Sequence, residues 1–429
     1  MVTVNLGRSR QNDIYTGGVH GRRPTVPTDF AELERRAEAT MSRRGWAYIA
    51  GGAGEGRTMA ANRAALDSWA IVPRVLRDVS ERSLEIELFG QKLAAPVLFA
   101  PVGAGALARE NADVLIGRAA AELGVPYIFS NQGCAPMEEV AAAMERVRPG
   151  APRWFQLYWS TDDRLVASLI SRAEKMGAAA LAVTLDTTML GWRPQDLNLG
   201  SLPFARAEGI DQYTSDPAFW EIVRERLAAA TAEKPEVSIG AIKTLLRIAR
   251  NVPGSVLSNV RTPHARAAVQ TFLDIYSRPS LNWDDIASLR QRTELPIVLK
   301  GVLHPDDARQ AAALGVDGIV VSNHGGRQID GSISSTDALV DIVDAVGGSL
   351  KILADSGFYT GADVFKALAL GADAVCIGRP HMYGLALAGA EGARDAVANI
   401  LAELDLTLGL SGHTDVAGLD RSALKYLGR

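Results

Sequence analysis

Residues 297–378 carry four short apolar runs that decide the fold, namely IVLK (297–300), IVVSN (319–323), ILADS (352–356) and VCIG (375–378). The runs begin 22, 33 and 23 residues apart. Short runs rich in β-branched residues, each followed by a polar or glycine-containing segment, are typical of buried strands. One parallel strand with its crossover helix takes about 25–30 residues. This stretch therefore predicts repeated strand–helix units.

Four similar runs precede this stretch, namely VLFA (97–100), YIFS (127–130), WFQLY (154–158) and ALAVTLD (180–186). They begin 30, 27 and 26 residues apart, and 117 residues separate the start of the fourth run from the start of the fifth. Eight such units predict an α/β fold, a closed (β/α)8 TIM barrel. On the number of units alone, a doubly wound open sheet is the alternative.

The long spacing predicts a helical insertion of about residues 197–280 after the fourth strand. Ile242, Leu245, Leu246 and Ala249 recur there at helical spacing. Long loops above a barrel often form lids or binding elements, although subunit packing is an equal alternative. An N-terminal cap of about residues 28–90 is expected to begin with one or two helices, broken by a glycine-rich loop at residues 51–56. We expect residues 1–429 to form a single domain.

The composition excludes several classes of protein. The 429 residues are 47% hydrophobic and 22% charged, with a net charge of −4, which is typical of a globular protein and unlike nucleic-acid or polybasic membrane binders. Cys134 and Cys376 are too few for a disulfide framework, and no Cys/His cluster suggests a metal. The apolar stretch 93–108 is shorter than a membrane span of ~20 residues. The first residues lack the apolar segment of a secretory signal, so we expect a cytoplasmic protein.

The strongest functional pattern is SNHGGRQ (322–328), at the end of the sixth predicted strand. Active sites of such barrels lie at the carboxyl ends of the strands. His324, followed three residues later by Arg327, can supply a base beside an anion anchor. A buried core histidine is the alternative, but the segment is too polar and too rich in glycine for a core.

Other strand ends supply an amide, hydroxyl groups, carboxylates and cations. These residues are Gln156, Tyr158, Thr184, Asp186, Arg193, Lys300, Asp355 and Arg379. Loops after the last two strands commonly bind phosphate in such barrels. Lys300 is either a buried cation or a Schiff-base amine. Together these groups fit a phosphorylated cofactor and a small anionic substrate, and neither a GxSxG nor a P-loop sequence is present.

Five motifs in order, FQLY (155–158), LGWRPQD (190–196), LPIVLKG (295–301), SNHGGRQ (322–328) and ADVFKALALGA (362–372), resemble the FMN-dependent L-2-hydroxy acid oxidizing family. The resemblance covers about residues 28–410, except for the insertion. Three segments, LDTTMLGWRPQDL (185–197), HPDDAR (304–309) and DSGFYTGADV (355–364), are most similar to lactate 2-monooxygenase. The long insertion also resembles that branch of the family.

The resemblance implies a catalytic set. In it, His324 takes the hydroxyl proton while the α-hydrogen leaves to the flavin, and Asp186 steadies the protonated His324. Arg193 and Arg327 clamp the substrate carboxylate. Tyr48 and Tyr158 contact the carboxylate and the hydroxyl, and Tyr158 is counted with the catalytic residues. No metal is expected.

The resemblance also implies a set of FMN contacts. Lys300 faces N1 and stabilises the anionic reduced flavin. The ring is held by Ala100, Val102, Gly103, Ser130, Gln156 and Thr184. The ribityl chain and the phosphate are held by Ser322, Asp355, Gly357, Gly378 and Arg379.

Three positions depart from the family's pattern. Tyr359 stands where the family usually has an arginine that serves the phosphate, which removes a charge-assisted contact of ~1.5–3 kcal/mol. Gly103 replaces an alanine found in many oxidases of the family and leaves more room near the flavin. Gln132 replaces the tryptophan of glycolate oxidases, so the pocket wall differs. Leu190, Trp192, Gln132 and the insertion are expected to shape the substrate pocket.

The predicted reaction is the oxidation of L-lactate with O2 to acetate, CO2 and water. The alternatives within the family are an oxidase that gives a 2-oxo acid and H2O2, and a dehydrogenase that uses another acceptor. A Schiff-base aldolase that uses Lys300 and a degenerate flavin-binding protein, which only Tyr359 motivates, are alternatives of other classes. The family resemblance implies a homotetramer or a larger assembly.

Overall fold

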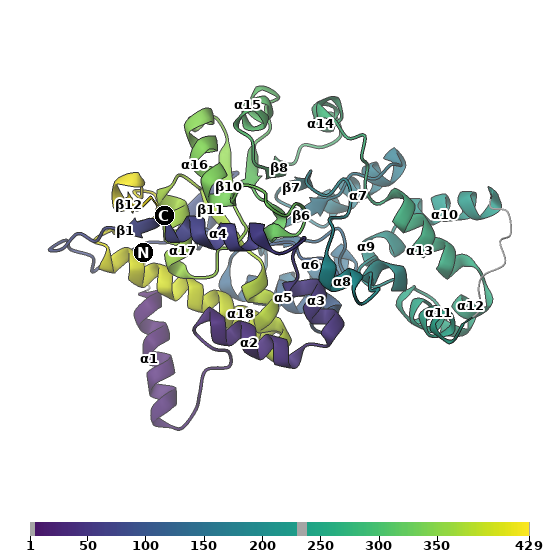
Figure 1. Ribbon diagram of the computed structural model, residues 1–429, viewed down its shortest axis with the longest axis horizontal. Coiled ribbons are helices and arrows are strands. Elements are labelled where there is room, and N and C mark those ends of the chain that lie inside the picture. The colour runs from purple at the N-terminus through teal and green to yellow at the C-terminus, as the bar shows by residue number, and fades with distance from the viewer. Residues whose placement is uncertain (1–4, 230–237, 429) are drawn as a thin grey trace.

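Eight parallel strands form a closed barrel in the computed structural model, which describes residues 5–229 and 238–428 (Figure 1). The strands are β4 (Val97–Phe99), β5 (Tyr127–Phe129), β6 (Arg153–Leu157), β7 (Leu181–Thr184), β8 (Ile297–Val302), β9 (Gly318–Val321), β10 (Lys351–Ala354) and β11 (Ala374–Ile377). The last strand pairs with the first, Val375 opposite Val97. The barrel prediction is therefore confirmed, and the open sheet is excluded.

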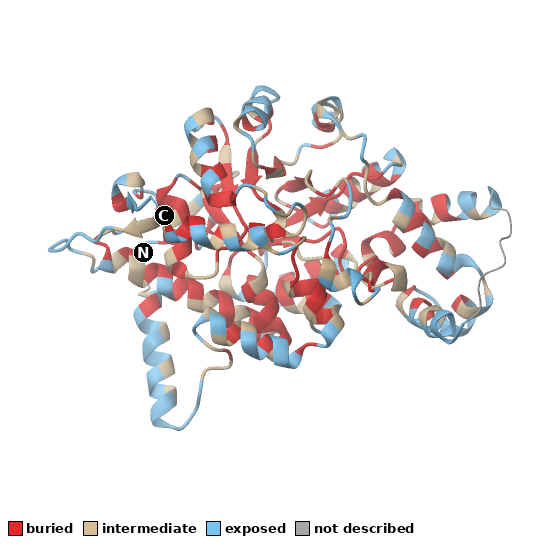
Figure 2. Cartoon of the chain, viewed as in Figure 1, coloured by how far each residue is buried: buried red, intermediate tan, exposed pale blue. Residues whose placement is uncertain are grey.

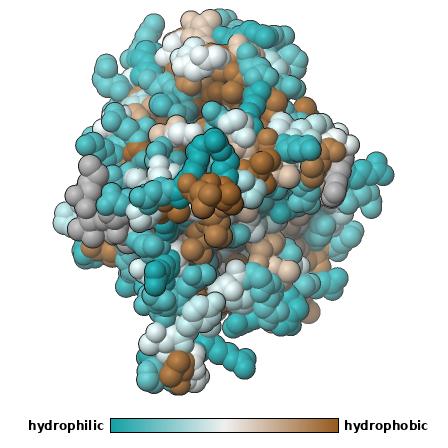
Figure 3. All heavy atoms as spheres, turned by 90° about the vertical axis from the view of Figure 1, so that its left-hand side faces the viewer, coloured by the Kyte–Doolittle hydropathy of each residue, from teal (hydrophilic) through white to brown (hydrophobic). Residues whose placement is uncertain are grey.

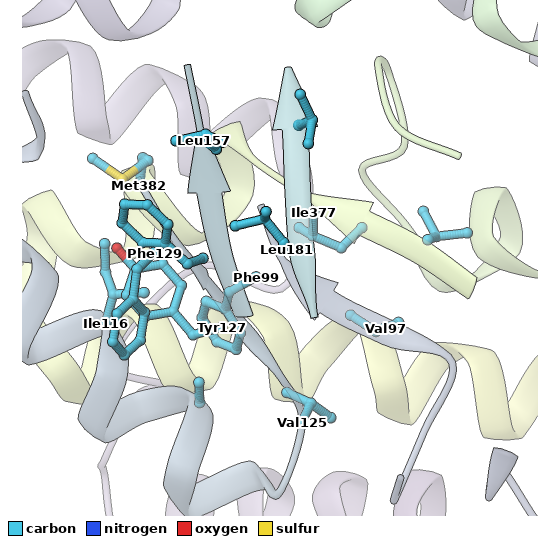
Figure 4. Packing of buried hydrophobic residues seen from close by; sticks show 14 of the residues in the cluster. Val97, Phe99, Ile116, Val125, Tyr127, Phe129, Leu157, Leu181, Ile377 and Met382 are labelled. Carbon is cyan, nitrogen blue, oxygen red and sulfur yellow. The ribbon is translucent and has the colours of Figure 1, made fainter. Parts of the chain in front are cut away.

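Alternate residues along each strand face the inside and the outside of the barrel. Leu98, Ile128 and Trp154 belong to the core cluster inside the barrel, whereas Val97 and Phe99 belong to the larger cluster between the strands and the helices. Figure 4 shows part of the larger cluster, in which Phe99 and Phe129 lie near Met382 and Ile116. The buried residues accordingly follow the strands and the inner faces of the helices (Figure 2).

Helices cover the outside of the barrel and hold the loops at its carboxyl end. They are α5 (Ala112–Leu123), α6 (Met137–Val147), α7 (Asp163–Lys175), α14 (Trp283–Leu289), α15 (Pro305–Ala313), α16 (Ser335–Val346), α17 (Gly361–Ala369) and α18 (Arg379–Leu410). Side chains that accept hydrogen bonds from backbone N–H groups fix where several of these helices begin. Thr360 and Asp363 form a capping box on α17, and His304 accepts a hydrogen bond at the start of α15.

The N-terminal segment contains α1 (Leu6–Val19), α2 (Phe30–Thr40), α3 (Arg43–Ala50) and α4 (Arg57–Asp67). One or two helices were predicted over residues 28–66, but the structure has three there, α2, α3 and α4. Met41 takes an extended conformation that ends α2, and the Ser42 side chain then caps α3. Tyr48 consequently lies on a helix. The polar helix α1, which was not predicted, projects from the barrel and contacts mainly α18 (Figure 1).

Two small antiparallel sheets lie outside the barrel. Strand β1 (Trp69–Ile71) pairs with β12 (Leu424–Tyr426), and β2 (Ile86–Leu88) pairs with β3 (Gln91–Leu93). The loop after β1 exposes Val75 and Leu76. The end of the molecule that faces the viewer in Figure 3 is mostly hydrophilic, with a small apolar patch near its centre.

The insertion between β7 and β8 is helical, as predicted. Its elements before α14 are α8 (Pro194–Leu197), η2 (Pro203–Arg206), α9 (Asp211–Thr214), α10 (Pro217–Ala229), α11 (Ile239–Asn251), α12 (Val256–Arg261) and α13 (His264–Ile275). The helices extend to the right of the barrel in Figure 1. Phe204 and Phe272 join the main core cluster, so this segment packs against the barrel. Within residues 5–229 and 238–428, no helix has the length and apolar character needed to span a membrane.

Candidate active site

A cleft that is partly open to solvent lies where the strand ends converge. Most of the site residues predicted from the sequence line it. These are Tyr48, Ala100, Val102, Gly103, Tyr158, Arg193, Lys300, His324, Arg327, Asp355, Gly357, Gly378 and Arg379. They come from the N-terminal segment and from seven different strand ends. The fold thus brings together side chains that are up to 331 positions apart, from Tyr48 to Arg379.

Five predicted residues, Ser130, Gln156, Thr184, Asp186 and Ser322, do not line the cleft but lie behind its wall. Three of them form a buried hydrogen-bonded row. The Gln156 amide donates to Thr184 at 3.0 Å and accepts from Ser130 at 3.2 Å. A buried amide satisfied in this way is held in one orientation.

His324 is paired with a carboxylate. Its Nδ1 lies 2.8 Å from Asp186 Oδ1, and the Thr187 hydroxyl donates to the same oxygen at 3.0 Å. Burial favours the neutral imidazole, and the pKa of His324 lies below its usual value although Asp186 opposes this shift. Burial alone would raise the pKa of Asp186, but His324 and Lys300 together lower it to about 2. At neutral pH the pair is therefore a neutral base beside an ionised carboxylate.

The loop that carries His324 is held by hydroxyl groups. His324 has a φ of 58°, in the left-handed region that residues other than glycine seldom adopt. Its N–H donates to Ser322 Oγ at 3.0 Å, and the Ser356 hydroxyl accepts the N–H of Gly325 at 2.8 Å. The surrounding hydrogen bonds therefore hold an unfavourable backbone conformation that fixes the direction of the imidazole.

Two arginines reach the cleft without an acidic partner among the described residues. Arg327 Nη1 donates to the backbone oxygens of Tyr48 and Gly51, the latter at 2.9 Å, and its guanidinium lies 4.9 Å from the Tyr48 ring centre. Arg193 Nε donates to the Arg327 oxygen at 3.0 Å. Burial and the charge of Arg193 lower the pKa of Arg327. A bound carboxylate would relieve the repulsion between these two cations.

Lys300 is a buried cation beside the same cleft. Its Nζ lies 3.0 Å from Asp355 Oδ2 and 2.8 Å from Ser322 Oγ. Burial opposes the charge, but Asp355 and Asp186 raise the pKa of Lys300 above its usual value. The lysine is therefore charged at neutral pH and does not match the low-pKa amine of a Schiff-base enzyme.

The residues that line the cleft fit FMN. At one end the backbone is closely packed, because a Cβ at Gly103 would lie 2.9 Å from the Gln132 Cβ. At the other end Gly357, with a φ of 93°, and Gly378 stand beside Arg379. Arg379 Nε is buried and has no hydrogen-bond partner in the described part of the chain. A cation beside a glycine turn suits a phosphate.

The structure also corrects the predicted pocket wall. Gln132 and Leu190 line the cleft as expected, but Trp192 does not, and this residue is 73% exposed. The insertion also contributes to the cleft as expected, through Phe204 and Tyr276, although neither residue was predicted individually. No sequence signal marks them, since they lie far along the chain from any strand end.

Tyr359 lines the cleft and is packed between two side chains. Phe30 stacks on it with the ring centres 3.9 Å apart, and the Arg63 guanidinium lies 4.9 Å from its ring centre. Arg63 also forms an ion pair with Asp363 at 2.7 Å. The position expected to carry an arginine is thus filled by an aromatic ring that a neighbouring cation covers.

Comparisons with known proteins agree with this arrangement. The family model described as FMN-dependent dehydrogenase matches residues 37–426. The chain is 42% identical to an FMN-dependent alpha-hydroxy acid dehydrogenase of Penicillium citrinum, over 100% of this chain and 98% of the relative. It is 41% identical to an L-lactate oxidase of Lysinibacillus sphaericus, over 96% of both chains. A crystal structure of mandelate oxidase superposes with a TM-score of 0.72 at 32% identity, covering 93% of this chain and 98% of the other.

Proposed function

Because the chain belongs to the FMN-dependent dehydrogenase family and is an FMN-dependent α-hydroxy acid oxidoreductase, we propose that its substrate is L-lactate and that its products with O2 are acetate, CO2 and water. The observation that supports this most strongly is the His324–Asp186 pair in one cleft with Arg193 and Arg327. These groups match the hydroxyl and the carboxylate of a 2-hydroxy acid.

His324 is the base in this proposal. Asp186 occupies Nδ1, so Nε2 is the ring nitrogen left to take the substrate's hydroxyl proton. The imidazolium that forms is stabilised by the ionised Asp186. FMN, when bound, supplies the acceptor for the two electrons and the α-hydrogen. His324 thus holds the proton while the α-carbon is oxidised to a carbonyl.

The cations place the substrate in this proposal. Arg193 and Arg327 bind the carboxylate, and Tyr48 and Tyr158 contact the carboxylate and the hydroxyl. Fixing both ends of a small molecule removes much of the entropic cost of reaction. Lys300, a buried cation that lines the cleft, would stabilise negative charge on the reduced cofactor when FMN is bound.

The monooxygenase outcome depends on retention of the first product. Oxidation of lactate by O2 gives pyruvate and H2O2, and H2O2 then converts retained pyruvate to acetate, CO2 and water. Phe204 and Tyr276 from the insertion support this proposal, since they line the cleft, and the Phe204 ring lies edge-on to Tyr48 at 6.3 Å. In this proposal they form a roof over the cleft that delays the release of pyruvate.

A plain oxidase is the second candidate, because one relative is named L-lactate oxidase. One experiment separates the outcomes. The visible spectrum of the FMN-loaded protein is recorded before and after anaerobic L-lactate, and O2 is then admitted and the products are measured. Bleaching followed by acetate and CO2 supports the proposal. Bleaching followed by equal amounts of pyruvate and H2O2 indicates the oxidase, and an unchanged flavin spectrum excludes lactate.

The proposed assembly is a homotetramer or larger. Light scattering on the purified, FMN-loaded protein tests this directly, and a monomer at micromolar concentration would contradict it.

A further inference from the structure

The side-chain amide of Gln328 uses both its donor and its acceptor groups on the loop that follows β7. Its Nε2 donates to the Asp186 backbone oxygen at 2.6 Å and to the Met189 oxygen at 3.0 Å. Its Oε1 accepts from Arg193 Nη2 at 2.8 Å and from the Gly191 N–H at 3.4 Å. One residue therefore contacts the segment 186–193 at four points.

These contacts join two loops that do not follow neighbouring strands. Gln328 lies in the loop after β9, and residues 186–193 follow β7, with β8 between them in the barrel. The two loops touch directly, because a Cβ on Gly191 would lie 2.6 Å from the Arg327 oxygen. The β9 loop carries His324, and the β7 loop carries both Asp186 and Arg193. The Gln328 amide therefore connects the histidine's loop to the carboxylate and the arginine.

We propose that Gln328 is a positioning residue that holds the Arg193 guanidinium at a fixed distance from the His324–Asp186 pair, and so sets the affinity for the substrate carboxylate. This inference rests on the proposed function of Arg193. Arg193 Nε already donates to the Arg327 oxygen. Because Gln328 also holds Nη2, the guanidinium is fixed at two of its nitrogens before the substrate binds.

Only a primary amide suits this position. A carboxylate would lose both donations to backbone oxygens and would pair with Arg193, competing with substrate. A methionine of similar length would leave two backbone oxygens, one backbone N–H and one guanidinium N–H without their partner. Asparagine keeps the amide, but its shorter side chain cannot reach all four groups.

The test uses FMN-loaded wild type, Gln328→Met, Gln328→Glu and Gln328→Asn, with Gln310→Met on the exposed face of α15 as a matched control. The dissociation constant of oxalate, an unreactive dicarboxylate, is measured anaerobically from the change in the flavin spectrum. The pH dependence of flavin reduction by L-lactate and the dissociation constant of FMN are measured on the same variants.

We expect oxalate to bind about tenfold or more weakly to Gln328→Met and Gln328→Asn. In Gln328→Glu the loss should grow as the pH rises and the introduced carboxyl ionises. FMN affinity and the acid limb of the pH profile should stay as in wild type, because His324 and Asp186 remain in contact. A general disruption of the site would instead change FMN affinity and the pH profile together with oxalate affinity. Unaltered oxalate affinity in all three variants would overturn the inference. A wild type that no 2-hydroxy acid reduces would instead refute the proposed function.

Discussion

The Nδ1 atom of His324 and the Oδ1 atom of Asp186 lie 2.8 Å apart, although the two residues are 138 positions apart in the chain. Replacing Asp186 by Asn keeps the size of the side chain but removes the charge that stabilises an imidazolium. We expect flavin reduction by substrate to slow by about 100-fold or more. Stopped-flow absorbance under anaerobic conditions measures this rate. Asp196→Asn, on helix α8 after the same loop and off the His324 ring, is the comparison variant, and an equal loss in both would contradict a specific role for Asp186.

The acid limb of the pH profile follows from the same pair. Burial lowers the pKa of His324 below its usual value, so the base form persists at neutral pH. The rate of reduction at low substrate should therefore fall only as the pH drops below ~6.5. Because Asp186 raises the pKa of His324, Asp186→Asn should move this limb to still lower pH. If the rate of the wild type already fell at a pH above the usual pKa of histidine, a group other than His324 would be titrating.

The strands of the barrel could be predicted because each is a short apolar run buried on both faces, and chemically distinctive side chains such as Lys300 and His324 lie near the carboxyl ends of these runs. Other features leave no such pattern. Helix α3 depends on one serine cap at Ser42, and Phe204 approaches the cleft only through the packing of the insertion. Gln328 contacts mostly backbone atoms of another loop, and such contacts leave no pattern in the residue types of the sequence.

The ring end of the cleft leaves no room for a larger residue at position 103. A Cβ on Gly103 would lie 2.9 Å from the Gln132 Cβ and 3.1 Å from its Oε1. Gly103→Ala should lower the free energy of unfolding by ~1–3 kcal/mol. Urea unfolding at one saturating FMN concentration measures this. The double variant Gly103→Ala/Gln132→Gly removes the opposing Cβ and Oε1, so Gly103→Ala should cost less stability in the Gln132→Gly background than in wild type, and strict additivity would show that the two side chains do not meet.

The end of the cleft that is proposed to bind the FMN phosphate allows a prediction of tighter FMN binding. Tyr359 lines it without contributing a charge, and its ring stacks on Phe30 at 3.9 Å. Tyr359→Arg should tighten FMN binding by about tenfold, as expected for one added charge-assisted hydrogen bond. Quenching of FMN fluorescence on titration measures the dissociation constant. Tyr359→Phe keeps the stacked ring and should bind FMN as wild type does, and equal affinities in all three proteins would place the phosphate elsewhere.

In the proposed reaction, Phe204 and Tyr276 form a roof over the cleft that retains pyruvate. Phe204 packs on Phe272 at 5.3 Å and lies edge-on to Tyr48, so a smaller, unstacked side chain there should open an exit without touching the base or the arginines. Phe204→Leu should reduce flavin with lactate at nearly the wild-type rate but release pyruvate and H2O2 in place of acetate and CO2. A peroxide assay and organic-acid chromatography during turnover measure the two outcomes.

Phe219→Leu provides the control for Phe204→Leu, because Phe219 is equally buried in the insertion but does not line the cleft. It should lower stability by a similar amount and leave the products unchanged. Peroxide from both variants would attribute the leak to a loosened insertion as a whole. Stoichiometric peroxide and pyruvate from the wild type would mean that the roof retains nothing and that the enzyme is an oxidase.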